Sequence, residues 1–442
     1  MSKYNVVTQK RNNETNQANK ERLKLNGTYG DHLQLDTTVN SGKGITGLTI
    51  NRDTDRTTTK NSDDYNGISA WEASTKSDYE NQKKNVNSAI QNQIQNNKDY
   101  QQELDRLNQN ANAPVITTDS VNQAFKLADE PDANAMVKIL NNNIHYTSNS
   151  WAYYFTSDIN PYTNNLKGDL FQITFTNLKN STYRGSKISK IVETVSDSTP
   201  TGNKITNADH SIYTNGTSDY FIMFTKNPQQ GNMHSPDVTV TYQYYDADGK
   251  LIDFSGAKDA WLSIGSLNFD QGNADSTAGV SEGVKAISGV NIKQLAGSSV
   301  TVHDDGWAYA GFNNYTGTGI NDGPNSWDKP NSPNAYYGTV VFQLNGTAAS
   351  IREGLRPWGG ANIAQEYNNA RLNNAWIIAA TTLPQTKLQR KTTKVNYHLD
   401  KLNVNPVTEK TTQVDYHYDV AQAISQAELY AIFNAFSCAY YT

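Results

Sequence analysis

Aromatic and amide side chains gather in one window of the sequence, between residues 301 and 340. Proteins bind sugars by stacking the C–H faces on aromatic rings while amide, carboxylate and backbone groups bond to the hydroxyls, so this mixture is typical of a carbohydrate site. We predict that Trp327 is a partly exposed ligand platform and Tyr336 its neighbour. Trp307 and Tyr337 are expected to be mainly structural. The other predicted ligand contacts are Asn313, Tyr315, Asn325, Asp328 and Asn334.

Three prolines stiffen the loop that carries Trp327. Pro324, Pro330 and Pro333 lie in "NDGPNSWDKPNSPN", where Asn, Gly and Ser otherwise favour irregular structure. Their fixed φ angles lower the entropy that the loop loses when it orders around a ligand. Tyr337 opens the apolar run "YGTVVFQL", which predicts a strand and therefore burial of that ring.

Carboxylates outnumber basic groups in the same window. The acids are Asp304, Asp305, Asp322 and Asp328, and the base is Lys329. This balance disfavours a phosphate backbone as the ligand. Oxygen donors that lie close in sequence can hold Ca²⁺, so a Ca²⁺ ion at Asp304 and Asp322 is expected, although no calcium-loop spacing is met. No other cofactor is predicted.

The sequence has none of the familiar catalytic motifs, such as the G-x-S-x-G turn, the H-E-x-x-H zinc motif or the Gly-rich phosphate loop. A glycosidase needs two carboxylates facing each other across a cleft, and adjacent residues such as Asp304 and Asp305 point to opposite sides, so we interpret them as a turn. The segment "DADG" lacks the further ligands of an EF-hand and predicts a hairpin turn. The protein is therefore predicted not to be an enzyme.

Two nearly identical segments follow each other near the end of the chain, "KTTKVNYHLD" at 391–400 and "KTTQVDYHYD" at 410–419. Apolar residues alternate in each copy, which predicts extended segments. His398 and His417 have the chemistry of metal ligands. Histidines in extended repeats are more often just exposed, and we interpret both in that way.

The composition indicates where the protein is located and which kinds of site it cannot contain. Of the 442 residues, 36% are hydrophobic and 18% charged, with a net charge of −5. Cys438 is the only cysteine, which excludes an intramolecular disulfide and a Cys-based zinc site. The charge gives no general attraction to nucleic acid or anionic membranes, and no run is apolar enough to span a membrane. The bias toward Tyr, Asn and Thr favours an extracellular protein, whose numbering begins inside a longer precursor, over a cytosolic one.

Five segments differ in their patterning. Residues 1–70 are polar and predicted to be disordered. Apolar residues from Tyr79 to Leu107 recur at helical spacing and predict an amphipathic stalk helix within 71–113. Short apolar or alternating runs divided by Gly, Asn and Asp predict a large all-β sandwich over 114–384, which is expected to fold alone. The extended repeats occupy 385–420, and the Ala-rich residues 421–442 have no assigned role.

Five motifs within about 117–383 occur in a specific order: "VNQAFKLADEPDANA", "FTNLKNSTYRGSKISKIV", "IDFSGAKDAWLSIGSLNF", "ISGVNIKQLAGSSVTVHDDGWAYAG" and "PNSWDKPNSPNAYYG". Together they resemble the variable region of the streptococcal antigen I/II adhesins and the related glucan-binding protein C. The resemblance implies a wall-anchored surface adhesin of Gram-positive bacteria. Its variable domain would be a lectin-like β-sandwich, carried on a helical stalk and followed by Pro-rich repeats.

The residues and the resemblance together predict a non-enzymatic adhesin that binds a polysaccharide or glycoprotein on a cell surface or in a biofilm matrix. Two alternatives stay open. One is an aggregation adhesin that binds extracellular DNA, as related enterococcal domains do, and the acidic window disfavours it. The other is a polysaccharide-cleaving enzyme, disfavoured because no facing pair of carboxylates is found. An extracellular, cell-surface location is expected without membrane insertion of this chain, in which neither a signal peptide nor a wall anchor is recognised.

Overall fold

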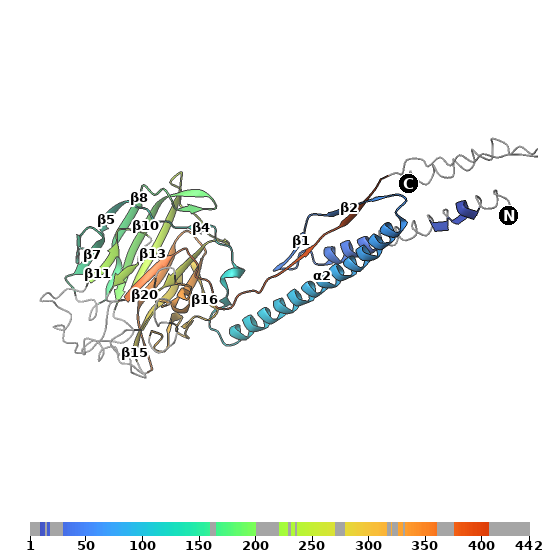
Figure 1. Cartoon of the computed structure of the whole chain (residues 1–442). Helices are drawn as coiled ribbons and strands as arrows, with labels where there is room; N and C mark the ends of the chain where they lie inside the picture. The colour runs from blue at the N-terminus through green and yellow to red at the C-terminus, as the bar shows by residue number, and fades with distance from the viewer. Residues whose placement is uncertain are drawn as a thin grey trace, which may run out of the picture. The chain divides into compact units, whose positions relative to one another are not determined.

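The computed structural model divides the chain into two compact units, which are described separately (Figure 1). The first unit comprises Met1–Lys43, Ile50–Ala89 and Lys394–Thr442, and the second comprises Gly44–Thr49 and Ile90–Thr393. The structure describes residues 9–13, 16–17, 30–159, 165–199, 221–228, 231–234, 237–269, 279–315, 320, 326–329, 332–359 and 375–405.

The first unit is built around residues 65–89 of the helix α2 (Tyr65–Asn108), which confirms the predicted amphipathic helix. Buried positions such as Ile68, Tyr79 and Val86 recur every three or four residues and form one face of the helix. A shorter helix over residues 30–41 buries Leu35 and Val39 in the same unit. No helix among the described residues has the length and apolarity needed to cross a bilayer.

Two pairs of strands lie mostly in this unit. β1 (Leu48–Arg52) pairs with β22 (Thr393–Tyr397), and β2 (Arg56–Asn61) runs parallel to β23 (Asp400–Asn405). The prediction of disorder for residues 1–70 is therefore wrong over residues 30–70. The polar composition suggested disorder, but the polar strand β2 is stabilised by pairing with β23, in which Arg56 lies opposite Asp400, 344 residues away.

The extended form predicted for the first repeat is confirmed by β22. The second repeat, with His417, and the Ala-rich tail lie outside the described residues, so those predictions are untested. The expectation that residues 115–383 fold alone also stays a prediction.

The second unit contains a β-sandwich, as the alternating pattern predicts (Figure 1). One sheet has ten strands, with the order β17-β18-β15-β20-β13-β10-β8-β5 and β4 and β9 at its side. Their bounds are β4 Phe125–Lys126, β5 Asn134–Ile139, β8 Leu166–Thr176, β9 Thr182–Tyr183, β10 Ser186–Thr199, β13 Asp237–Asp246, β15 Gly279–Ser288, β17 Val300–Val302, β18 Trp307–Ala310 and β20 Ala349–Trp358.

The other sheet has nine strands in the order β3-β16-β19-β14-β21-β12-β11-β7-β6. Their bounds are β3 Val115–Ile116, β6 Ile144–Ser148, β7 Ala152–Ser157, β11 Phe221–Thr225, β12 Asn232–His234, β14 Trp261–Gly265, β16 Val290–Leu295, β19 Val340–Leu344 and β21 Ala375–Ala380. Phe155 of β7 stacks on Phe171 of β8 with 3.6 Å between ring centroids, so side chains from the two sheets meet in one core. The "DADG" segment forms the expected turn, in which Gly249 N donates to Asp246 O.

A polar group lies inside this core. Glu193 of β10 pairs in register with Tyr242 of β13 and sits between the core residues Ile191 and Val195, so the two-residue period of the strand directs its carboxyl group inward. Burial raises the pKa of Glu193 to about 8, and the nearby Glu353 contributes in the same direction. The Glu193 carboxyl is therefore largely protonated at neutral pH.

Candidate ligand-binding site

Trp327 is buried, which contradicts the prediction that it forms a partly exposed platform. Its side chain is only 2% exposed, and its Nε1 donates to the backbone oxygen of Asn314 at 3.0 Å. The ring covers Gly338 so closely that a Cβ atom there would lie 1.8 Å from Trp327 Cζ3. The stiff, polar loop thus carries an anchor for the sandwich rather than a free aromatic face, and Trp327 is not available for stacking in this structure.

Asn314 organises the interior beneath the ring. Its side chain is fully buried, and Nδ2 donates to Leu267 O at 3.0 Å and to Ser299 Oγ at 2.9 Å, while Oδ1 accepts from Phe269 N at 3.1 Å. A buried amide with this many partners fixes the neighbouring backbone. Asn314 is one of several amides in the window, and nothing in the sequence distinguishes it from its neighbours as the structural centre.

The tyrosine pair next to the loop differs from expectation as well. Tyr336 lies in the 3-10 helix η5 (Ala335–Gly338), is 6% exposed and packs in a cluster with Trp261 and Leu295. It is therefore a core residue, and the prediction that it flanks an exposed platform is wrong. Tyr337 is half-buried and contacts Trp327 edge-on, with 6.0 Å between ring centroids.

Trp307 has the structural role predicted for it. The side chain on β18 is 7% exposed, and the guanidinium carbon of Arg356 lies 3.6 Å from the ring centroid. Arg356 in turn pairs with the buried Asp237, with 2.5 Å between Nη2 and Oδ2. Trp307 therefore supports a buried ionic contact on the opposite face of the sheet from Glu193.

The remaining predicted contacts that the structure describes are half-buried: Asn313, Tyr315, Asp328 and Asn334. Tyr315 lies 6.3 Å from Trp327 between ring centroids, and Asn313 Oδ1 accepts from Tyr315 N at 3.0 Å. Asp328 Oδ2 accepts from Asn268 Nδ2 at 3.0 Å, and burial raises the pKa of Asp328. Tyr315 and Asp328 therefore lie near the Trp327 ring or its loop with part of their surface accessible.

Two of the predicted residues, Asn325 and Asp322, lie outside the described residues, so the Ca²⁺ prediction is untested. Asp304, the other expected ligand, is exposed, and its Oδ1 accepts from Asn112 Nδ2 at 3.1 Å. Asp304 and Asp305 form the turn before β18, in which Asp305 Oδ1 accepts from Trp307 N at 3.0 Å. The interpretation of this acidic pair as a turn is confirmed.

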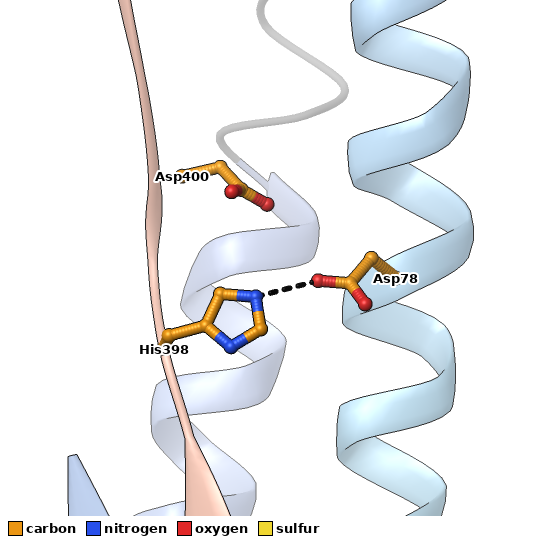
Figure 2. Close-up of side chains that lie close together, drawn as sticks. All are labelled: Asp78, His398 and Asp400. Carbon is orange, nitrogen blue, oxygen red and sulfur yellow. Dashed lines mark hydrogen bonds and ion pairs between the residues drawn. The ribbon is translucent and has the colours of Figure 1, made fainter. Parts of the chain in front are cut away.

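A group with metal-ligating side chains lies in the first unit instead (Figure 2). Asp78 on α2 faces His398 at the end of the first repeat, and His398 Nε2 lies 2.9 Å from Asp78 Oδ2. Asp400 supplies the third side chain, and the three ligand atoms lie within 4.8 Å of one another. The interpretation of His398 as merely exposed is therefore wrong, because the backbone pairing that holds the first repeat brings its ring to the helix.

Arg56 already balances the charge of this group. Its Nε and Nη2 bind the two oxygens of Asp400 at 2.8 and 2.9 Å, and Nη2 also lies 2.5 Å from Asp78 Oδ2. Gln82 bonds to both Asp78 and His398: its Nε2 donates to Asp78 Oδ2 at 2.8 Å, and its Oε1 accepts from His398 N at 2.8 Å. A cation would have to displace the guanidinium, so we interpret these contacts as a connection between the helix and strands β2 and β23.

A protein-family model named glucan-binding protein C matches residues 108–378, which include most of the sandwich. The chain belongs to the glucan-binding protein C family. This confirms the resemblance found in the sequence motifs. Among solved structures, glucan-binding protein C of Streptococcus mutans is 17% identical with a TM-score of 0.45, covering 74% of this chain and 98% of that one. The DNA-bound adhesin domain of PrgB from Enterococcus faecalis is 19% identical with a TM-score of 0.38, covering 53% and 72%.

Proposed function

We propose that this chain is the ligand-binding part of a non-enzymatic cell-surface adhesin, and that its sandwich binds a glucan-type polysaccharide outside the cell. The observation that carries the proposal is the family match over residues 108–378, which spans strands of both sheets. The amide and aromatic residues of the 301–340 window support the same ligand class.

Within that window the contact set differs from the one that the sequence favoured. Trp327 and Tyr336 are buried supports, so the proposed contacts are the accessible groups around them: Asn313, Tyr315, Asp328 and Asn334. Tyr315 supplies an aromatic face, while the amides and the carboxyl group can bond to sugar hydroxyls. The buried ring and the Asn314 network keep these groups in place before the ligand arrives, which lowers the entropy cost of binding.

DNA is the main alternative ligand, since the PrgB adhesin domain has been solved bound to DNA. The exposed acids Asp304 and Asp305 oppose a phosphate backbone at this window, whose sequence contains a single Lys or Arg, Lys329. Cleavage of the polysaccharide is the other alternative. The acidic pair is a turn, and Glu193 faces the interior of the sandwich, so neither supplies two carboxyl groups that face each other across a cleft.

The test is a glycan array that includes α- and β-glucans, run beside a DNA mobility shift at two salt concentrations. We expect glucan binding with little dependence on salt. Tyr315→Ala should weaken that binding by roughly 1 to 2 kcal/mol, and Asp304→Ala, on the exposed turn, serves as the control. A blank array together with tight, salt-sensitive DNA binding would replace the polysaccharide by DNA.

A further inference from the structure

The tip of the hairpin formed by β6 and β7 exposes a tryptophan that the proposed function has not used. Trp151 is 49% exposed and meets Tyr154 nearly at a right angle, with 6.1 Å between ring centroids and 83° between the ring planes. Two perpendicular rings form a corner of two apolar walls. This corner belongs to the edge of the nine-stranded sheet, because β6 is its last strand.

The backbone that carries the exposed ring is held by hydrogen bonds at its N–H group and at its carbonyl oxygen. Asn149 Oδ1 accepts from Trp151 N and from Ala152 N, both at 3.0 Å, and Asn149 Nδ2 donates to Tyr154 Oη at 2.9 Å. On the other side, Trp151 O accepts from Lys226 N at 3.1 Å. A single exposed apolar residue is common on protein surfaces. A tryptophan on a hydrogen-bonded turn, paired with a second ring and an amide, is a more specific arrangement, because the turn is organised before any ligand binds.

The chemistry of the tip points to a neutral ligand rich in hydroxyl groups. From Tyr146 to Thr156 the sequence has no charged side chain, and the nearby Lys226 places its Nζ over the ring of Tyr153, 5.1 Å from the ring centroid. The neighbours of the ring in the turn, Ser148, Asn149 and Ser150, are exposed and offer only hydroxyl and amide groups. We propose that Trp151, Tyr154 and Asn149 form a second saccharide-contact site, in which a sugar ring packs in the aromatic corner and bonds to the polar turn. This inference rests on the proposed binding of a glucan.

The second site is separate from the first on the sandwich. Strand β19 directly follows η5, which carries Tyr336, and the order of the sheet places β14, β21, β12, β11 and β7 between β19 and β6. A long polysaccharide has many identical units, so a chain bound at one site raises the effective concentration of units at the other. Loss of the hairpin site should therefore affect a polymer more than a short oligosaccharide.

The experiment compares three variants of the full chain: Trp151→Ala, Trp151→Phe and, as a control, Ile287→Ala, which removes an equally exposed apolar side chain (50%) from β15. The probes are dextran, a soluble α-glucan, and laminarin, a soluble β-glucan, and affinity is measured by native electrophoresis in gels that contain each polymer. We expect Trp151→Ala to weaken binding of the better probe roughly tenfold, Trp151→Phe less, and Ile287→Ala not at all. Melting temperatures recorded in parallel should stay near that of the wild type.

The outcomes separate the two proposals. If the wild type binds a glucan and Trp151→Ala binds it equally well, the hairpin site is wrong and the proposed function stands. If the wild type binds neither polymer, the proposed function fails and the hairpin site fails with it. If Trp151→Ala lowers the melting temperature, Trp151→Phe decides, because the smaller ring retains the packing: unchanged affinity in that variant overturns the site, and a selective loss supports it.

Discussion

The same three residues, Asn-Ser-Trp, occur in two loops of the sandwich with opposite outcomes. In residues 149–151 the tryptophan is 49% exposed, and in residues 325–327 it is 2% exposed. Trp151 meets Asn149 and Tyr154 of its own hairpin, and its carbonyl oxygen accepts from Lys226 N. The ring of Trp327 is fixed from outside its loop, by Asn314 and the bare backbone of Gly338.

The difference teaches that a polar loop around an aromatic residue is not evidence of an exposed ring. Both loops satisfy the composition rule for a turn or irregular segment. Only the loop at Trp327 has a glycine beneath it that lets an indole ring approach the backbone, and a buried carbonyl at Asn314 that accepts the indole N–H. The ring of Trp327 is buried because Gly338 leaves space for it and Asn314 O accepts its N–H, not because of the sequence of its loop.

The largest expected contrast is in stability. Trp327→Ala should lower the free energy of unfolding by about 3 to 5 kcal/mol, because it leaves a cavity over Gly338 and removes the bond to Asn314. Trp151→Ala should change it by only about 0.5 kcal/mol. Chemical denaturation of both variants measures the difference. If Trp327→Ala keeps the stability of the wild type and loses ligand affinity, the contrast between the two tryptophans is wrong, and the ring of Trp327 contacts the ligand.

The pH dependence of the unfolding free energy tests whether a second side chain, that of Glu193, is completely buried. The folded-state pKa of Glu193 is raised to about 8, so between the ordinary glutamate value and pH 8 the folded protein binds more protons than the unfolded chain. Stability is then highest at the acidic end of this window and falls as pH rises through it, at up to about 1.4 kcal/mol per pH unit for one group. Glu193→Gln should flatten this part of the curve and be more stable than the wild type near pH 8.

The measurement is chemical denaturation of the full chain at several values between pH 5 and pH 8. Glu80→Gln, which changes an exposed glutamate on α2, serves as the matched control and should follow the wild type. If the unfolding free energy of Glu193→Gln changes with pH as steeply as that of the wild type, Glu193 does not lie in the apolar environment that the register of β10 implies.

A third test adds volume where the buried ring needs space. Gly338→Ala places a methyl group 1.8 Å from the position of Trp327 Cζ3, so the ring or the η5 backbone must move. We expect a loss of about 1 to 3 kcal/mol in unfolding free energy, the usual cost of overpacking. Ser150→Ala, beside the exposed Trp151, should be neutral within about 0.5 kcal/mol. Equal stability of Gly338→Ala and the wild type would mean that Trp327 does not press on this glycine.

The smallest effect is expected at the turn that supports Trp151. Asn149→Ala removes the acceptor for two backbone N–H groups and the donor to Tyr154, and should cost about 1 kcal/mol. Tyr154→Phe deletes only the hydroxyl partner of Asn149 and should cost less. Thermal unfolding of the two variants ranks them. If both match the wild type, the hairpin tip is not held by the Asn149 contacts, and the contrast between a locally and a distantly fixed tryptophan disappears.

Periodicity in the sequence determined a large part of the architecture. Helical spacing from Tyr79 to Leu107 predicted α2, and alternating runs such as "LFQITFTNL" predicted the strands, because burying one face imposes a period on any regular element. The acidic turn at Asp304 and the motifs of the family were also readable, since both depend on neighbours in the chain. Ile94 is one of the apolar residues between Tyr79 and Leu107, but it is 46% exposed, so helical spacing alone does not ensure burial.

Tertiary structure alone decided which groups are accessible. His398 meets Asp78, and Arg56 meets Asp400, only because β2 pairs with a strand 344 residues away. Trp327 is buried because Asn314 and Gly338 create a place for its ring, while Trp151 has no such covering and stays half-exposed. A sequence pattern specifies which face of an element is apolar. The exposure of a single side chain depends on atoms supplied by segments far along the chain, and those atoms are brought together only by folding.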